Sequence, residues 1–213
     1  MADRLYLSLW YPNFRLESLP AALNCVMAQF ARVGGQKHVY TAAAYPLSWN
    51  EAPVYERLYV VSPQAEDNDA AFAPNAIAEA TEQLHDDMAY EFELRWPLWS
   101  PELPLVDEGV TLDPIWKQQP SAVRVVGYGP QFDDAGFEQN GHVRVDFGLD
   151  SPFLLEEVAL DPIATQRVQQ NIEMLLAFTL SIEKHCGISS RLLWTESGEP
   201  FAQKLIDRLQ RLN

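Results

Sequence analysis

The sequence has no long apolar run and no apparent export signal, and these two absences bear on where the protein works. No uninterrupted apolar stretch of about 18 residues occurs, so the sequence predicts no membrane-spanning helix. The first residues, Met-Ala-Asp-Arg-Leu-Tyr, lack the basic region and apolar run of a secretory signal peptide. We therefore expect a cytoplasmic protein that does not bind membranes.

Basic residues are also scarce. The 213-residue chain has 15 Lys and Arg against 30 Asp and Glu, which gives a net charge of -15. A nucleic-acid-binding protein normally carries a basic stripe that neutralises phosphates, and none is visible, so we expect no nucleic-acid partner. The negative charge has two interpretations: it keeps the protein soluble, or it attracts a basic protein.

Cysteine is limited to two residues, whereas aromatic residues are plentiful. Cys25 and Cys186 lie far apart, each in a segment with helical periodicity, and we expect two buried free thiols. A single disulfide is the alternative and would require an oxidising compartment. The six Trp, eight Tyr and ten Phe favour an ordered globular core over a disordered chain.

The first half of the chain alternates between strand and helix patterns. Strands are predicted at residues 4–11, 38–45, 55–61 and 89–96, and helices at 18–33 and 74–88. The run from Leu58 to Val61 is apolar on both faces and predicts a central strand. The order β-α-β-β-α-β over residues 1–98 is typical of a ferredoxin-like arrangement, with two helices on one face of an antiparallel sheet.

The second half has a different order, β-β-α-β-α. Strands are predicted at residues 123–128, 142–149 and 191–195, and helices at 162–185 and from 200 onwards. Five prolines between residues 97 and 120 predict an irregular connector over 99–121. We expect an α+β fold with an antiparallel or mixed sheet and helices mainly on one face. Residues 1–98 and 122–213 form either two domains or one continuous domain.

The acidic residues are unevenly distributed along the chain. Nine of them and no Lys or Arg lie between Arg57 and Arg95, whereas residues 184–211 hold five basic residues. The negative charge concentrates in residues 58–94 and 133–161. This asymmetry predicts an acidic surface that could steer a basic partner, although a solvated helix and loops would show the same pattern.

The predicted sheet face away from the helices carries aromatic and Arg side chains among polar groups. Such a composition is typical of protein interfaces. The alternatives are burial of this face against the other half of the chain or against a second copy. The candidate binding residues are Tyr6, Trp10, Arg95, Arg124, Tyr128 and Arg144.

His142, Arg144 and Asp146 stand two apart on one strand and so project from the same face. A histidine beside a carboxylate could act as a base with its orienting group, or begin a metal site. A solvated sheet face is the alternative interpretation. No phosphate loop, nucleophile elbow, calcium loop or zinc spacing is present, and we expect no metal and no cofactor.

Two classes of function follow from these patterns. The leading hypothesis is a non-catalytic protein-binding module with an acidic surface, comparable in composition to bacterial immunity-type or inhibitor proteins that neutralise toxins. The alternative is a small hydrolytic or metal-assisted enzyme with a site near His142 and Asp146. Assembly into a symmetric homo-oligomer with a structural role is a third hypothesis.

Overall fold

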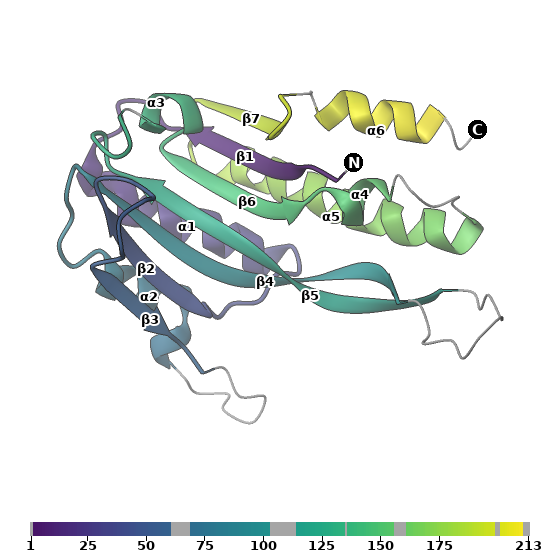
Figure 1. The fold of residues 1–213 in the computed structure, drawn as a ribbon, viewed down its shortest axis with the longest axis horizontal. Coiled ribbons are helices and arrows are strands. Elements are labelled where there is room, and N and C mark those ends of the chain that lie inside the picture. Colours follow the sequence, from purple (N-terminus) through teal and green to yellow (C-terminus); the bar gives the residue numbers. More distant parts are fainter. Residues whose placement is uncertain are drawn as a thin grey trace.

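The protein is built on one seven-stranded antiparallel sheet (Figure 1). The computed structural model describes residues 2–60, 69–102, 114–134, 136–155, 161–198 and 201–210. The strands are β1 (Arg4–Trp10), β2 (Thr41–Pro46), β3 (Tyr55–Leu58), β4 (Met88–Glu102), β5 (Ile115–Tyr128), β6 (Val143–Leu149) and β7 (Ser190–Thr195). They lie in the order β3-β2-β4-β5-β6-β1-β7. The expected α+β class with an antiparallel sheet is confirmed.

The helices are α1 (Leu19–Arg32), α2 (Ala73–Ala80), α3 (Gly136–Asn140), α4 (Ser151–Leu154), α5 (Pro162–His185) and α6 (Phe201–Gln210). In Figure 1, α1, α2 and α5 lie behind the sheet. Pro162 begins α5, and the Asp161 carboxylate caps it by accepting a hydrogen bond from the Ala164 amide at 2.7 Å. Within the described ranges, no helix combines the length and apolarity needed to cross a bilayer.

The core lies between the sheet and these helices. Alternation in β1 sends Leu5, Leu7 and Leu9 towards the helices, and all three are fully buried. Phe178 of α5 occupies the middle of an aromatic group, with ring centroids 5.6 Å from Phe30, 5.9 Å from Trp96 and 6.0 Å from Phe147. Edge-on contacts of this kind add to the burial of apolar area.

The ferredoxin-like pairing expected for residues 1–98 is not confirmed. β1 pairs with β6 and β7 from the second half, whereas β2 pairs with β3 and β4. The predicted central strand at 55–61 is also wrong, because β3 is an edge strand on which Leu58 is 71% exposed. Strands from both halves thus share one sheet, and the division into domains stays a prediction.

The expectation of an irregular segment over residues 99–121 is wrong at both ends, because β4 continues to Glu102 and β5 starts at Ile115. Pro97 and Pro120 lie directly opposite each other in the ladder. The amide of Trp99, two residues along β4, points away from β5 and donates to Asn171. Pro97 and Pro120 therefore form a pair whose backbone nitrogens do not take part in hydrogen bonds between β4 and β5. Proline, which has no amide hydrogen, is tolerated at such a pair.

Asn171 of α5 protects the free edge of β4. Its side chain accepts from the Trp99 amide and donates to the Trp99 carbonyl, each at 2.9 Å, and it donates to the Pro152 carbonyl at 2.8 Å. Asn171 is fully buried. The two bonds to Trp99 satisfy backbone groups that a sheet edge would otherwise leave unpaired, and the third joins α5 to α4.

Cys25 in α1 and Cys186 directly after α5 form a disulfide, with their Cα atoms 5.6 Å apart. The expectation of free thiols is therefore wrong. The two residues are separated by 161 positions in sequence, so only the packing of α1 against α5 brings them together. Disulfides persist in oxidising compartments, and this bond weighs against the expected cytoplasmic location, which stays a prediction.

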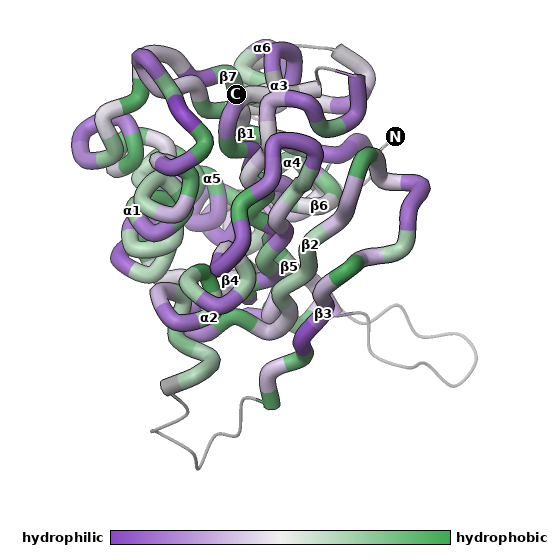
Figure 2. The backbone as a smooth tube through the Cα atoms, turned by 90° about the vertical axis from the view of Figure 1, so that its left-hand side faces the viewer, coloured by the Kyte–Doolittle hydropathy of each residue, from purple (hydrophilic) through white to green (hydrophobic). Residues whose placement is uncertain are grey.

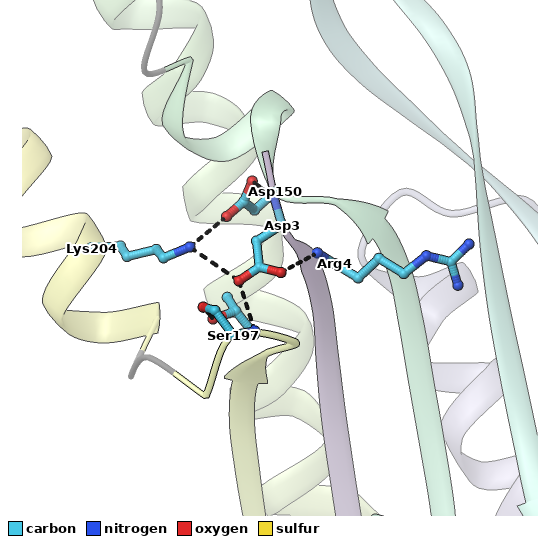
Figure 3. Close-up of polar contacts among 6 residues, drawn as sticks. Asp3, Arg4, Asp150, Ser197 and Lys204 are labelled. Atoms are coloured by element: carbon cyan, nitrogen blue, oxygen red, sulfur yellow. Dashed lines mark hydrogen bonds and ion pairs between the residues drawn. The ribbon is translucent and has the colours of Figure 1, made fainter. Parts of the chain in front are cut away.

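A buried ionic group ties the two ends of the described chain together (Figure 3). The Lys204 ammonium of α6 lies 3.3 Å from Asp150 and 3.4 Å from Asp3, and the Ser197 amide donates to Asp3 at 3.0 Å. Side-chain exposure is 12% for Lys204 and 2% for Asp150. The cation thus offsets the cost of burying two carboxylates and fixes α6 against the start of β1.

This group predicts a loss of stability in acid. Hydrogen bonds from Ser197, assisted by Lys204, lower the pKa of Asp3 from 3.8 to about 2. Because the folded pKa is the lower one, the stabilisation is complete above about pH 4 and is lost as the pH falls towards 2. Urea unfolding between pH 6 and pH 2.5 should show a smaller decline for Asp3→Asn than for the wild type. Equal declines would contradict this account, and Glu17→Gln, at an exposed carboxylate, is the control.

Candidate functional site

The strand register places the six candidate binding residues on the sheet face away from α1, α2 and α5. Tyr6 lies opposite Asp146, which lies opposite Arg124. Arg144 of β6 likewise lies opposite Ser8 of β1 on one side and opposite Val126 of β5 on the other. The remaining candidates are Trp10, Arg95 and Tyr128. They stand at strand positions whose side chains point to the same face as those of Tyr6, Arg124 and Arg144. We call this surface the open face.

Two arginines of the open face, Arg95 and Arg124, are paired with glutamates beside them. Arg124 lies 3.5 Å from Glu93 and 3.9 Å from Glu91, and Arg95 lies 2.7 Å from Glu93. Burial raises the pKa of Glu91, and the positive charge of Arg124 opposes that shift. Because these charges are compensated within the chain, this region offers little net charge to a partner.

Arg144 is held between two tyrosines. Its guanidinium carbon lies 5.1 Å from the Tyr6 ring centroid and 5.4 Å from that of Tyr128, and it donates to the Asn140 side chain at 3.2 Å. Such stacking is favourable for a guanidinium. Tyr128 is only 1% exposed because Phe132 and Trp49 pack over it. Tyr128 is thus a packing residue beneath the surface.

Aromatic residues at the β1 and β7 edge also contact their own chain. The Tyr6 and Trp194 rings lie 4.7 Å apart, and the Trp194 indole donates to Ser8 at 3.0 Å. The Trp10 indole donates to the Glu138 carbonyl at 3.3 Å. Trp194 was not among the sequence candidates, although it lies opposite Tyr6 in the pairing of β1 with β7 and so shares the open face.

His142 and Asp146 have separate partners. The His142 Nδ1 atom accepts a hydrogen bond from the Tyr11 amide at 2.9 Å, and the ring stacks on Phe14 with centroids 4.3 Å apart. Burial lowers the pKa of His142. Asp146 pairs with Arg4 at 3.2 Å and accepts from the Gly148 amide at 2.8 Å. The contacts described for the two side chains do not join them as a base and its orienting group.

No cluster suited to a metal ion is found in the part of the chain that the structure describes. A protein-bound metal usually needs three or more His, Cys, Asp or Glu side chains that converge, and none of the described residues form such a group.

A second surface lies at one end of the sheet, where three loops meet. These are residues 46–54 between β2 and β3, residues 81–87 before β4 and residues 129–141 after β5. The Leu47 amide donates to the Asp87 carbonyl at 2.7 Å, and the Asp133 amide donates to the Leu47 carbonyl at 2.8 Å. Figure 2 looks onto this end of the molecule. Backbone hydrogen bonds thus join all three loops, and we call them the acidic end.

The acidic end carries seven carboxylates and no Lys or Arg. They belong to Glu51, Glu82, Asp86, Asp87, Asp133, Asp134 and Glu138. Within the described ranges none of the seven forms an ion pair, whereas Glu91, Glu93 and Asp146 of the open face are paired. Described carboxylates from both acidic stretches of the sequence therefore meet at this end of the sheet.

Apolar side chains accompany these charges. Leu47 is 58% exposed and Val54 is 62% exposed, and Trp49 is partly buried beside them. Leu47, Asp133 and Asp134 have φ angles of 60°, 54° and 46°. The left-handed region is unfavourable for a leucine by about 1–2 kcal/mol, and the two backbone hydrogen bonds of Leu47 hold it there. The loop that carries Leu47 therefore has a defined conformation.

Sequence reasoning found the acidic stretches but not the acidic end. Asp133 and Leu47 are 86 positions apart, and their hydrogen bond depends on the pairing of β2, β4 and β5. The lack of Lys and Arg from each loop was visible in the sequence, and it was the only local signal.

Comparison with protein families, with curated protein sequences and with solved structures found no match to this chain.

Proposed function

We propose that the protein is a non-catalytic binding module whose acidic end holds a basic surface of another protein. One observation carries the proposal: seven carboxylates on three joined loops have no ion-pair partner among the described residues. The catalytic alternative has less support, because His142 and Asp146 are each engaged with other groups.

Electrostatics favours a cationic partner at this end. Like charges on neighbouring loops repel one another, and a partner that supplies Lys or Arg relieves the repulsion and gains charge-assisted hydrogen bonds. A negative field of this kind also accelerates diffusional encounter, and salt screens it over about 8 Å at physiological ionic strength. Association should therefore be fast and sensitive to salt.

The composition of the acidic end fits a protein surface better than it fits a lone cation. Leu47 and Val54 expose apolar area beside the charges, and Trp49 anchors the loop that carries them. Interfaces commonly combine apolar or aromatic anchors with a charged rim. Proteins of the immunity or inhibitor type would use such a surface to cover a basic site on a target, and we extend the proposal to that class.

The test is a capture experiment with two neutralised variants. One replaces three carboxylates of the acidic end, as Glu51→Gln, Asp86→Asn and Asp134→Asn. The matched control replaces three exposed carboxylates elsewhere, as Glu17→Gln, Glu173→Gln and Glu196→Gln. Each variant is used as bait against a displayed library of basic and acidic protein fragments, in low and high salt.

We expect the wild type and the control variant to select the same basic fragments, with on-rates that fall at least tenfold in high salt. The acidic-end variant should bind those fragments at least tenfold more weakly. Equal binding by the two variants would refute the proposal, as would selection of fragments without a basic surface. Circular dichroism confirms that both variants are folded.

A further inference from the structure

A cavity of about 380 Å³ opens beside the acidic end, between the helix-facing side of β2 and β3 and the end of α2. Its volume lies in the lower part of the range for ligand pockets, roughly 300–1,000 Å³. A single long side chain or a small amine fits such a volume. Its lining includes Ala44, Val54, Tyr55, Glu79, Glu82 and Met88.

The cavity has an apolar interior and a negative rim. Ala44 and Met88 contribute apolar surface, whereas Glu79 and Glu82 contribute carboxylates. Arg57 forms an ion pair with Glu79, so one of these charges is compensated within the chain. Glu82 is exposed and belongs to the acidic end. The remaining unpaired charge at the rim is therefore negative.

Tyr55 also lines the cavity, but its hydroxyl is buried and interacts with Tyr59 and Glu79. This hydroxyl is therefore engaged within the chain. A ligand at the exposed rim meets the Glu82 carboxylate instead.

The wall on the α2 side is rigid. The Tyr90 hydroxyl donates to the Gln83 carbonyl and accepts from the His85 amide, each at 3.0 Å. Both Gln83 and His85 line the cavity. A wall that is already fixed in the free protein reduces the ordering cost of binding.

We propose that this cavity receives a basic side chain of the partner, an arginine or a lysine. The aliphatic stem lies along Ala44 and Met88, and the cationic head reaches the Glu82 carboxylate. Basic side chains bury their stems and keep their charge at the polar edge in this manner. The inference rests on the proposed function, because it supplies an anchor for the same basic partner.

The probes are arginine and lysine with blocked termini, and blocked norleucine as the uncharged analogue of lysine. They are titrated into the full-length protein while backbone amide NMR signals are followed. We expect both cationic probes to shift the signals of Tyr55, Gln83 and His85 with saturable, millimolar affinity. Norleucine should bind at least tenfold more weakly. Equal binding of norleucine, or no saturable shift with the cationic probes, would overturn the proposal.

Two variants locate the binding in the cavity. Glu82→Gln should weaken the cationic probes at least threefold, and Val54→Phe, which fills the cavity from its exposed rim, should abolish their binding. Glu56→Gln removes an exposed charge from β3, outside both the cavity and the acidic end, and should leave the affinity unchanged. An equal loss in Glu56→Gln and Glu82→Gln would refute the cavity in favour of a diffuse charge effect.

The library experiment separates the two proposals. If the selected fragments depend on the acidic end but bind Glu82→Gln and Val54→Phe like the wild type, the cavity inference fails and the proposed function stands. If neutralising the acidic end leaves fragment binding intact, the proposed function fails, whatever the blocked amino acids do.

Discussion

Replacing Phe178 with alanine should lower the free energy of unfolding by about 3–5 kcal/mol. The side chain is fully buried, and its ring contacts Phe30, Trp96 and Phe147 at once. Truncation removes those contacts and leaves a cavity that three rigid aromatic rings cannot close. For a chain of this length the melting temperature should fall by roughly 6–20 °C.

Urea unfolding followed by tryptophan fluorescence measures the effect of Phe178→Ala, and Leu180→Ala is the matched control. Leu180 lies two residues further along α5 but is 58% exposed, so its truncation should change the free energy of unfolding by about 0.5 kcal/mol or less. Phe178→Leu should recover part of the loss because it refills part of the volume. Similar losses at positions 178 and 180 would contradict the packing described for α5.

Loss of the disulfide should have a comparable effect. Because 161 positions separate Cys25 from Cys186, the bond closes a long loop and restricts the unfolded chain strongly. We expect the double variant Cys25→Ala, Cys186→Ala to be about 4 kcal/mol less stable than the oxidised wild type.

Chemical denaturation with and without reductant measures the contribution of the disulfide. Reductant should destabilise the wild type to about the level of the double variant and leave the double variant unchanged. Thiol labelling of the denatured, unreduced protein provides an independent check. Labelling of both cysteines in that sample would show that the bond is absent and would remove the basis for the prediction.

Much of the fold could be predicted from local patterns. The period-two alternation of β1 and β6 and the helical spacing of α5 match the structure closely, because each pattern arises from burial of one face. The same patterns do not specify neighbours. Nothing in residues 4–10 indicates that β1 pairs with β6 and β7, and the ferredoxin-like expectation failed at this step.

Three further features depended on tertiary context. Pro97 and Pro120 are accommodated in strands because they lie opposite each other at a pair that is not hydrogen-bonded. Leu58 lies in an apolar run but on an edge strand. The candidate residues of the open face were placed on one face correctly, yet the sequence could not show that Arg124 and Arg95 pair with Glu93 beside them. Whether these residues contact a partner stays a prediction.

The buried contact of Lys204 with Asp3 and Asp150 has a practical consequence for experiments on binding. It holds the start of β1 and helix α6 together at the end of the sheet opposite the three acidic loops (Figure 1). A sensor or a carrier attached beside the start of β1 or beside α6 would therefore leave the acidic loops facing away from it. Immobilisation and fusion at these points should leave a partner's approach unobstructed.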